Sequence, residues 1–428
     1  MKTLLRHFVP FLFCATMIGC STGSTQGPPP PPPLESVQLQ EITGNVPAGM
    51  IEIQGLSAGN FNPSNWQRDT LNWVPDVRVP ILAPLTIGPW QNIYAPWALE
   101  QTTGWRVFYG GWDGTNTPND RVYSAATSDF LSFNNRTLVI DHGAFIHVNN
   151  ENVQQLPDGS LYMIGTAAPD QYGLNKPVFF SSPDGVTWNG SPQPYAAQFS
   201  DIISIPDYPS FQSGDFNGAN VLLYDNNAFT LYFSNWNDQS VQGTMYRATT
   251  SQPPVFQVQG LALATGHMVN DVRKFHVGGK NWYVMGLHTN VQAVWYSLSN
   301  DGVHFDQEHT MFGPAYAADQ YLITLSFVTQ GNKLLGVLYG GNIGGASLPQ
   351  DEIFARWLQK KVIFTDSSGL QYTPAGSYGP DRQWLQAPSS GSLAGTITVY
   401  AEDGATALAT GRISISAGKA YQLVFGGG

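Results

Sequence analysis

Hydrophobic and polar positions alternate along most of the chain in short runs that favour β-strands. These runs are rich in β-branched and aromatic residues and are separated by turn sequences such as Asp-Gly, Pro-Asp and Gly-Asn. They recur as five similar units, each with three strands and a turn that leads to a fourth. The first strands begin at Asn92, Asn152, Asn220, Asn270 and Gln320, and the second strands at Trp105, Leu161, Phe229, Asn281 and Lys333.

An aromatic residue marks the third strand of every unit. These residues are Tyr123, Phe180, Tyr246, Tyr296 and Phe354, so successive units lie 50 to 66 residues apart. The residues expected to open the fourth strands are Phe133, Trp188, Phe256, Phe305 and Val362. Four antiparallel strands repeated five times predict an all-β fold, a five-bladed β-propeller. A seven-stranded sandwich is the alternative, but about twenty strands in one internal order argue against it.

The segment Ser181–Trp188, "SSPDGVTW", predicts the turn between the third and fourth strands of the second unit. A related sequence, "SLSNDGVHF", stands at Ser297–Phe305. Because the turn recurs at the same place in the repeat, we interpret it as scaffold. It is expected on the face of the propeller opposite the central funnel, on which the innermost strands of the blades converge.

Four regions are expected along the chain. Residues 1–19 form a signal peptide, 20–49 a polar and Pro-rich tether, 50–383 the propeller and 384–428 a small C-terminal β-module. The stretch Ile51–Pro89 precedes the first blade and either closes the ring or covers one face.

The N-terminal segment has the pattern of an export signal. Lys2 and Arg6 precede a short apolar run, Phe8–Ile18, which is too short to span a bilayer comfortably. The run ends in Met17–Cys20, which resembles the lipobox of bacterial lipoproteins, in which the cysteine is lipidated. The resemblance implies a lipid on Cys20 and, with Ser21 next, the outer membrane of a Gram-negative bacterium. The alternative is an ordinary secretory signal.

Composition limits the classes of partner. Only 11% of residues are charged and the net charge is −11, which is unfavourable for nucleic acid because phosphate binding needs clustered Lys and Arg. Both cysteines lie in the first 20 residues, so disulfides and thiolate metal sites are not expected in the folded body. We expect a monomer.

Five blades with Ser-x-x-Asp-Gly-x-x-Trp/Phe hairpins resemble the arabinanase, xylosidase and fructosidase superfamily of glycosidases, over roughly residues 90 to 370. The resemblance implies a glycan in the central funnel, with catalytic carboxylates where the innermost strands of the first three blades begin. Those carboxylates would stand roughly 5 Å apart for retention, or 6.5–9.5 Å for inversion.

The matching positions of this chain lack carboxylates. The first falls on Ala95-Pro96, the second near Asn150 and the third on Asn217. Asparagine still bonds to sugar hydroxyls but does not transfer a proton at neutral pH.

A displaced set of acids stands close by. The expected catalytic residues are Asp271, Asp215, Glu151 and Asp120, with Asp319 at the same place in the fifth blade. The alternative is that these acids cap turns or bind backbone amides.

Aromatic and short polar side chains near the same face favour a neutral glycan. The expected binding residues are Trp112, Asp113, Asn150, Asn217, Trp236, Asn237, Asn270, His267 and His288. Packing against neighbouring blades is the alternative for the aromatic residues. No metal-ligand spacing is present. Asn and Asp oxygens on the axis are compatible with calcium, although no spacing requires it, so no cofactor is expected.

Three functions remain open at this point. The first is a surface glycosidase with a displaced catalytic set, the second a glycan-binding propeller without hydrolysis, and the third a lipoprotein that binds a partner protein.

Overall fold

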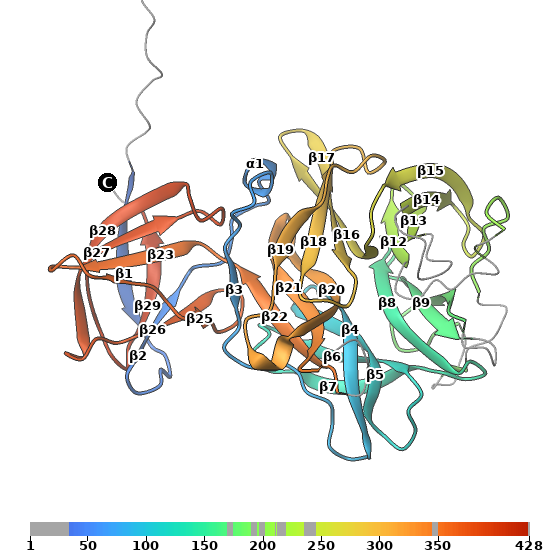
Figure 1. Ribbon diagram of the computed structural model, residues 1–428, viewed down its shortest axis with the longest axis horizontal. Coiled ribbons are helices and arrows are strands. Elements are labelled where there is room, and N and C mark those ends of the chain that lie inside the picture. Colours follow the sequence, from blue (N-terminus) through green and yellow to red (C-terminus); the bar gives the residue numbers. More distant parts are fainter. Residues whose placement is uncertain are drawn as a thin grey trace, which may run out of the picture. The chain divides into compact units, whose positions relative to one another are not determined.

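Six β-sheets make up nearly all of the regular structure in the computed structural model (Figure 1). The structure describes residues 34–168, 174–189, 195–196, 202–209, 211, 220–234, 245–344 and 350–426. Residues Glu35–Gly428 form one unit, separate from Met1–Leu34. The described helices are α1 (Pro63–Trp66) and the short 3-10 helix η2 (Ala317–Asp319).

Five of the sheets are the blades of a propeller, which confirms the predicted fold class. Blade 1 contains β4 (Trp90–Gln101), β5 (Gly104–Thr115), β6 (Arg121–Thr127) and β7 (Asn134–Asp141), with β11 (Tyr195–Ala196) at its edge. Blade 2 contains β8 (His147–Gln155), β9 (Leu161–Ala168) and β10 (Lys176–Ser182). Blade 3 contains β12 (Asn220–Asp225), β13 (Ala228–Ser234), β14 (Met245–Thr250) and β15 (Gln257–Leu263). Blade 4 contains β16 (Met268–Val277), β17 (Lys280–His288), β18 (Val294–Ser299) and β19 (His309–Phe312).

The N-terminal part of the chain closes the ring. Blade 5 contains β20 (Tyr321–Gln330), β21 (Lys333–Asn342) and β22 (Glu352–Leu358), and its outer strand is β3 (Trp73–Pro75). Leu358 of β22 pairs with Trp73 of β3 in antiparallel register. Of the two alternatives left open for Ile51–Pro89, the strand β3 within it closes the ring. The placement of Val362 in the fourth strand of blade 5 is wrong. Val362 is buried in another sheet, where its strand pairs with the C-terminal part of the chain.

The sixth sheet is a curled, mixed sheet of nine strands built from both ends of the unit (Figure 1). Its order is β24 (Gln371–Tyr372), β23 (Lys361–Asp366), β27 (Ser392–Tyr400), β28 (Ala407–Ser416), β1 (Glu35–Ile42), β29 (Ala420–Phe425), β2 (Met50–Gln54), β26 (Arg382–Gln386) and β25 (Gly376–Ser377). β1 lies in the segment predicted as tether, β2 and β23 to β25 lie in the segment predicted as propeller, and β26 crosses the predicted boundary at residue 384. They join this sheet because their apolar side chains, among them Val37, Ile53 and Phe364, fill its core.

Blade 2 differs from the expectation at its outer edge. Trp188 opens no strand in the described part of the chain, and Val178 of β10 instead forms an isolated bridge with Ile202. The Trp188 side chain is fully buried in the core shared by blades 1 and 2, with its ring edge-on to Phe108 of β5. It therefore fastens one blade to the next.

The predicted scaffold turn is held by side-chain to backbone hydrogen bonds. Asp184 accepts from the N–H groups of Val186 and Thr187, both at 2.8 Å, and Ser182 accepts from Gly185 N at 2.7 Å. Asp301 and Ser299 repeat the arrangement in blade 4. These bonds are the Asx and Ser turn contacts that fix a tight loop.

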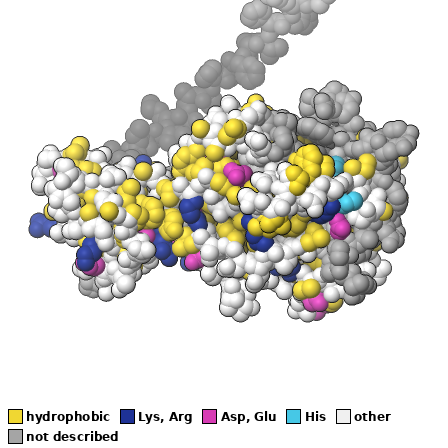
Figure 2. Space-filling view, turned by 90° about the horizontal axis from the view of Figure 1, so that it is seen from below, with side chains coloured by type: hydrophobic (Ala, Val, Ile, Leu, Met, Phe, Trp, Pro, Cys, Tyr) yellow, Lys and Arg dark blue, Asp and Glu magenta, His cyan; other side chains and the backbone are white. Residues whose placement is uncertain are grey.

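The surface agrees with the low content of charged residues. Figure 2 shows one face, on which Lys, Arg, Asp and Glu occur at scattered points among uncharged side chains. None of the described helices is long and apolar enough to cross a bilayer.

Candidate functional site

The innermost strands of four blades carry an irregularity near the same place. The pairing of β4, β8, β16 and β20 with the second strand slips around Ala95, Asn150, Asn270 and Thr324. Ala95, Asn150 and Thr324 have left-handed backbone, with φ of 51°, 52° and 55°. Bulges of this kind re-aim side chains. The irregularity makes these residues equivalent positions around the ring.

These residues enclose a small cavity on the propeller axis. It is lined by Ala95, Pro96, Asn150, Glu151, Asn220, Asn270, Thr324 and Leu325. Its free space of about 10 Å³ for the centre of a water molecule is enough for roughly one water. A sugar ring does not fit in a cavity of this size.

Beside the axis, Tyr94 of β4 is the centre of a buried polar cluster between blades 1 and 2. Its hydroxyl donates to Asp120 Oδ2 at 2.9 Å and accepts from Asn149 Nδ2, which also donates to Asp120 Oδ2 at 2.6 Å. The carbonyl of Asp120 accepts from Val148 N at 3.0 Å. The loop between β5 and β6 is thereby fixed to the inner strand of the next blade.

Glu151 extends the cluster towards the axial cavity. It is almost fully buried, and neither carboxyl oxygen finds a partner in another described residue. Gly110 of β5 makes room for it, since a Cβ there would lie 3.0 Å from Asn149 Cβ and 3.4 Å from Glu151 Oε2. Gly340 of β21 makes room for Tyr94 in the same way, because a Cβ at position 340 would lie 2.9 Å from Tyr94 Cβ.

A third carboxyl, Asp351, approaches from blade 5. Its Oδ1 accepts from Asn342 Nδ2 at 2.6 Å and its backbone N–H donates to Asn92 Oδ1 at 2.7 Å, while Oδ2 has no partner among the described residues. The side chain is fully buried. Blades 1, 2 and 5 each contribute at least one member of this group of acids.

Burial raises the pKa of all three acids. For Asp120 this rise in pKa is opposed by the electrostatic effect of His147 and by the hydrogen bonds that Tyr94 and Asn149 donate, all of which lower the pKa. Burial and then the charge of Asp120 raise the pKa of Glu151 well above its ordinary value. Burial, reinforced by Asp120, raises the pKa of Asp351 to about 7, although the bond from Asn342 lowers it. Burial therefore favours the neutral form of Glu151, and Asp351 is about half protonated at pH 7.

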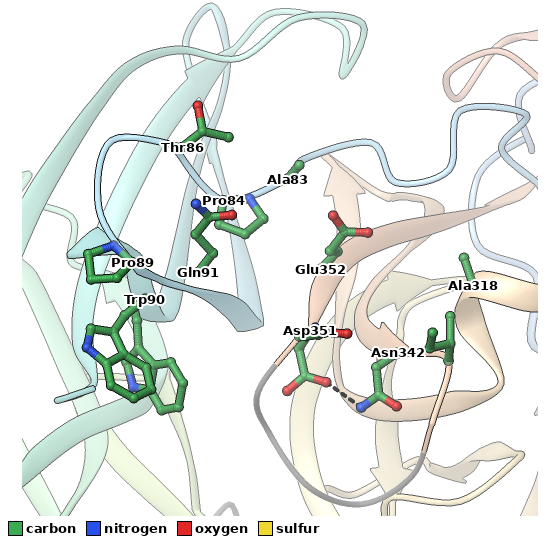
Figure 3. Close-up of a pocket in the computed structure, with 13 residues that line it drawn as sticks. Ala83, Pro84, Thr86, Pro89, Trp90, Gln91, Ala318, Asn342, Asp351 and Glu352 are labelled. Atoms are coloured by element: carbon green, nitrogen blue, oxygen red, sulfur yellow. Dashed lines mark hydrogen bonds between the residues drawn. The ribbon is translucent and has the colours of Figure 1, made fainter. Parts of the chain in front are cut away.

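A pocket of about 570 Å³ opens next to Asp351, between blades 1 and 5 (Figure 3). Trp90, Gln91 and Trp112 line it from blade 1, and Asn342, Asp351 and Glu352 from blade 5. The rings of Trp90 and Trp112 meet edge to face at 5.4 Å, and Trp90 is 38% exposed. Aromatic surface beside a few fixed polar groups is the composition of a small-molecule site.

Asp271 lies in a different environment. It is fully buried and accepts from Arg273 Nε at 2.9 Å and from Phe327 N at 2.7 Å. Arg273 also donates to the carbonyls of Ala98 and Phe327, both at 3.1 Å, and lies over the Trp97 ring at 4.0 Å. These contacts tie blades 4, 5 and 1 together and support a structural role for Asp271.

Asp113 and Asp319 are also held by the scaffold. Asp113 accepts from Leu85 N at 2.8 Å, Tyr109 Oη at 2.9 Å and Arg136 Nη2 at 2.5 Å. Asp319 accepts from Tyr316 N and from Tyr339 Oη, both at 2.7 Å.

His267 and His288 lie together at the start of blade 4. His267 Nδ1 bonds to Glu308 Oε2 at 2.8 Å, and its ring stacks on Trp295 at 3.7 Å. Burial and then His267 lower the pKa of His288 to about 3, so His288 is neutral. Asn270 follows on β16 and lines the axial cavity.

Five predicted residues, Asp215, Asn217, Trp236, Asn237 and Cys20, lie outside the described residues. Of the others, the structure brings Asp120, Glu151, Asn150 and Trp112 towards one region of the ring. Within the described ranges, no group of three or more His, Cys, Asp or Glu side chains is arranged to hold a metal ion.

Sequence reasoning missed Tyr94, Asn149, Trp90, Asp351 and Glu352. The signal for the two acids was present, because Asp351-Glu352 ends the segment between the second and third strands of blade 5.

No family model and no curated protein sequence matches the chain. Solved structures with a similar backbone include the catalytic domain of the Coprinopsis cinerea GH62 α-L-arabinofuranosidase, at 15% identity and a TM-score of 0.49, covering 68% of this chain and 98% of that one. A glycosyl hydrolase from Bacteroides ovatus matches at 12% identity and a TM-score of 0.47, and the match covers 69% of this chain and 96% of that one. A putative glycosidase from Bacteroides thetaiotaomicron matches at 12% identity and a TM-score of 0.45, and the match covers 69% of this chain and 99% of that one. At these values the function has to be argued from the side chains of this chain.

Proposed function

We propose that the protein is a surface-anchored glycan-binding propeller that holds its ligand in the pocket between blades 1 and 5. The observation that carries this proposal is the composition of the pocket, with two tryptophans on one wall and fixed amide and carboxyl groups on the other. Aromatic faces pack against the C–H faces of sugar rings, and the polar groups pair with hydroxyls.

The ring positions on the axis support binding without cleavage. Ala95, Asn150 and Thr324 occupy equivalent bulges and provide no carboxyl group. The axial cavity admits roughly one water molecule, so no glycosidic bond would be held between two acids there.

Hydrolysis is the second candidate function, and the pair Asp120 and Glu151 favours it. Burial raises the pKa of Glu151, and the charge of the second acid, Asp120, raises it further; Asp120 Oδ2 accepts two hydrogen bonds. Two carboxyls with different environments are the usual acid and base of a glycosidase.

Glycan binding is tested by screening the full-length protein on an array of neutral, amino and acidic oligosaccharides. We expect Trp90→Ala to weaken binding about tenfold or more, because it removes a partly exposed ring from the pocket wall. Ile87→Ala is the matched control, since Ile87 is 81% exposed nearby but does not line this pocket.

The array result separates the functions. Equal binding by Trp90→Ala and wild type would exclude the pocket, and an array without any bound sugar would leave the partner-binding lipoprotein. Shorter sugars released by wild type but not by Glu151→Gln would select hydrolysis.

The anchor is a further part of the proposal. We expect cells that express the chain to label it with a palmitate analogue and to keep it in the membrane fraction, because Cys20 ends a lipobox-like sequence. Cys20→Ala is expected to lose both the label and the membrane association. Labelling that persists in this variant would contradict the assignment of Cys20.

A further inference from the structure

The pocket between blades 1 and 5 has an unbalanced charge. Its described lining includes two carboxyl groups, Asp351 and Glu352, and none of its described lining residues is Lys, Arg or His. The lining amides and hydroxyl, from Thr86, Gln91, Asn342 and Gln350, are neutral. The site is therefore negative whenever either acid is ionised.

Asp351 is held in place by two hydrogen bonds, which leave one carboxyl oxygen unpaired among the described residues. Asn342 occupies Oδ1, and the backbone N–H of Asp351 is fixed by Asn92. Figure 3 shows the carboxyl group beside Asn342 on the blade 5 side of the pocket, across from Trp90. Oδ2 is buried and finds no partner in the described residues. A buried acceptor without a donor has a large desolvation cost, which a ligand donor would remove.

The surroundings of Asp351 favour a donor with positive charge. The charge of Asp120 opposes ionisation of Asp351, so a neutral donor would leave that repulsion in place. A cation would offset both charges and form a charge-assisted bond to Oδ2. The exposed ring of Trp90 adds an aromatic face that attracts cations.

We propose that the pocket selects sugars that carry a protonated amine, such as hexosamine units with a free ammonium group. This inference rests on the proposed glycan-binding function and adds the class of sugar. An N-acetyl group has one neutral N–H donor and no charge, and a uronic acid brings a carboxylate next to Asp351 and Glu352. Both classes bind less well for these reasons.

The test is a titration of the full-length protein, followed by tryptophan fluorescence, with three trisaccharides at pH 7. The probes are β-1,4-linked glucosamine, β-1,4-linked N-acetylglucosamine and α-1,4-linked galacturonic acid. We expect the glucosamine trimer to bind about tenfold more tightly than the N-acetylated one, and the acidic trimer to bind most weakly.

The variant Asp351→Asn keeps the shape of the side chain and removes its charge. We expect it to lose about tenfold in affinity for the glucosamine trimer and to keep its affinity for the N-acetylated trimer. Asp207→Asn is the control for net charge, because Asp207 is an exposed acid outside the pocket. It is expected to bind all three trimers as the wild type does.

Each outcome decides between the two proposals. Equal or tighter binding of the N-acetylated or acidic trimer, or a preference for the amine that survives in Asp351→Asn, overturns the amine selectivity and leaves glycan binding standing. If no trimer and no sugar of the array binds, the glycan-binding function itself is wrong, and the selectivity falls with it.

Discussion

Replacing Arg273 by alanine is expected to lower the free energy of unfolding by about 3–5 kcal/mol, because it leaves Asp271 as a buried charge without a countercharge. Arg273 also bonds to carbonyls of blades 1 and 5, so its loss opens the contact between three blades. The measurement is urea unfolding of both proteins at pH 7. The deficit should shrink at low pH, where Asp271 becomes protonated and needs no cation.

Two further variants show whether this effect belongs to the ion pair. Adding Asp271→Asn to Arg273→Ala should restore most of the lost stability. Arg121→Ala breaks a pair with Asp141 whose acid is 31% exposed, and should cost about 1 kcal/mol or less. A loss as small as this in Arg273→Ala, or no rescue by Asp271→Asn, would contradict the structural role of Asp271.

The buried acids are expected to make the fold less stable as the pH rises from about 4 to about 8. The pKa of Asp351 is raised from 3.8 to about 7 on folding, so the folded state binds the proton more tightly than the unfolded state between these values. Its favourable contribution is complete below pH 3.8 and is lost as the pH passes through 7. The loss amounts to about 4 kcal/mol. Glu151 acts in the same direction, since burial raises its pKa as well.

The contribution of Asp351 is isolated by comparing stability at pH 4.5 and pH 8. We expect Asp351→Asn to resemble the wild type at pH 4.5 and to be more stable by a few kcal/mol at pH 8, because the amide has no charge to bury. Asp158→Asn is the control, since bonds from Ser160 lower the pKa of this exposed acid. If the wild type instead becomes more stable from pH 4.5 to pH 8, and Asp351→Asn has the same stability as the wild type at both pH values, then ionising Asp351 costs the folded protein little free energy.

The strand repeat was predictable from the sequence because it depends on local rules. Alternating side chains and turn residues identified every third-strand aromatic, and Tyr123, Phe180, Tyr246, Tyr296 and Phe354 all lie in the third strands of their blades. The turn at Asp184 was likewise read correctly, since its hydrogen bonds join residues only two or three positions apart.

The site was only partly predictable, because its members come from different blades. Asp120 and Glu151 were found as polar residues near inner strands, but their shared partner Tyr94 looks like an ordinary strand aromatic in the sequence. Asp271 was predicted for the same reason as Asp120 and Glu151, because it is a polar residue near an inner strand. Its ion pair with Arg273, two residues later, indicates a structural role instead.

By itself, the sequence determined the five-fold strand pattern and the scaffold turns, because each depends on neighbours within a few positions. Only the tertiary structure decided that β3 closes blade 5 and that β1 and β2 complete the nine-stranded sheet. It also decided that Tyr94, Glu151 and Asp351 form one group of buried side chains. These arrangements depend on hydrogen bonds and burial between residues far apart in the chain, and a pattern of neighbouring residues carries no record of such contacts.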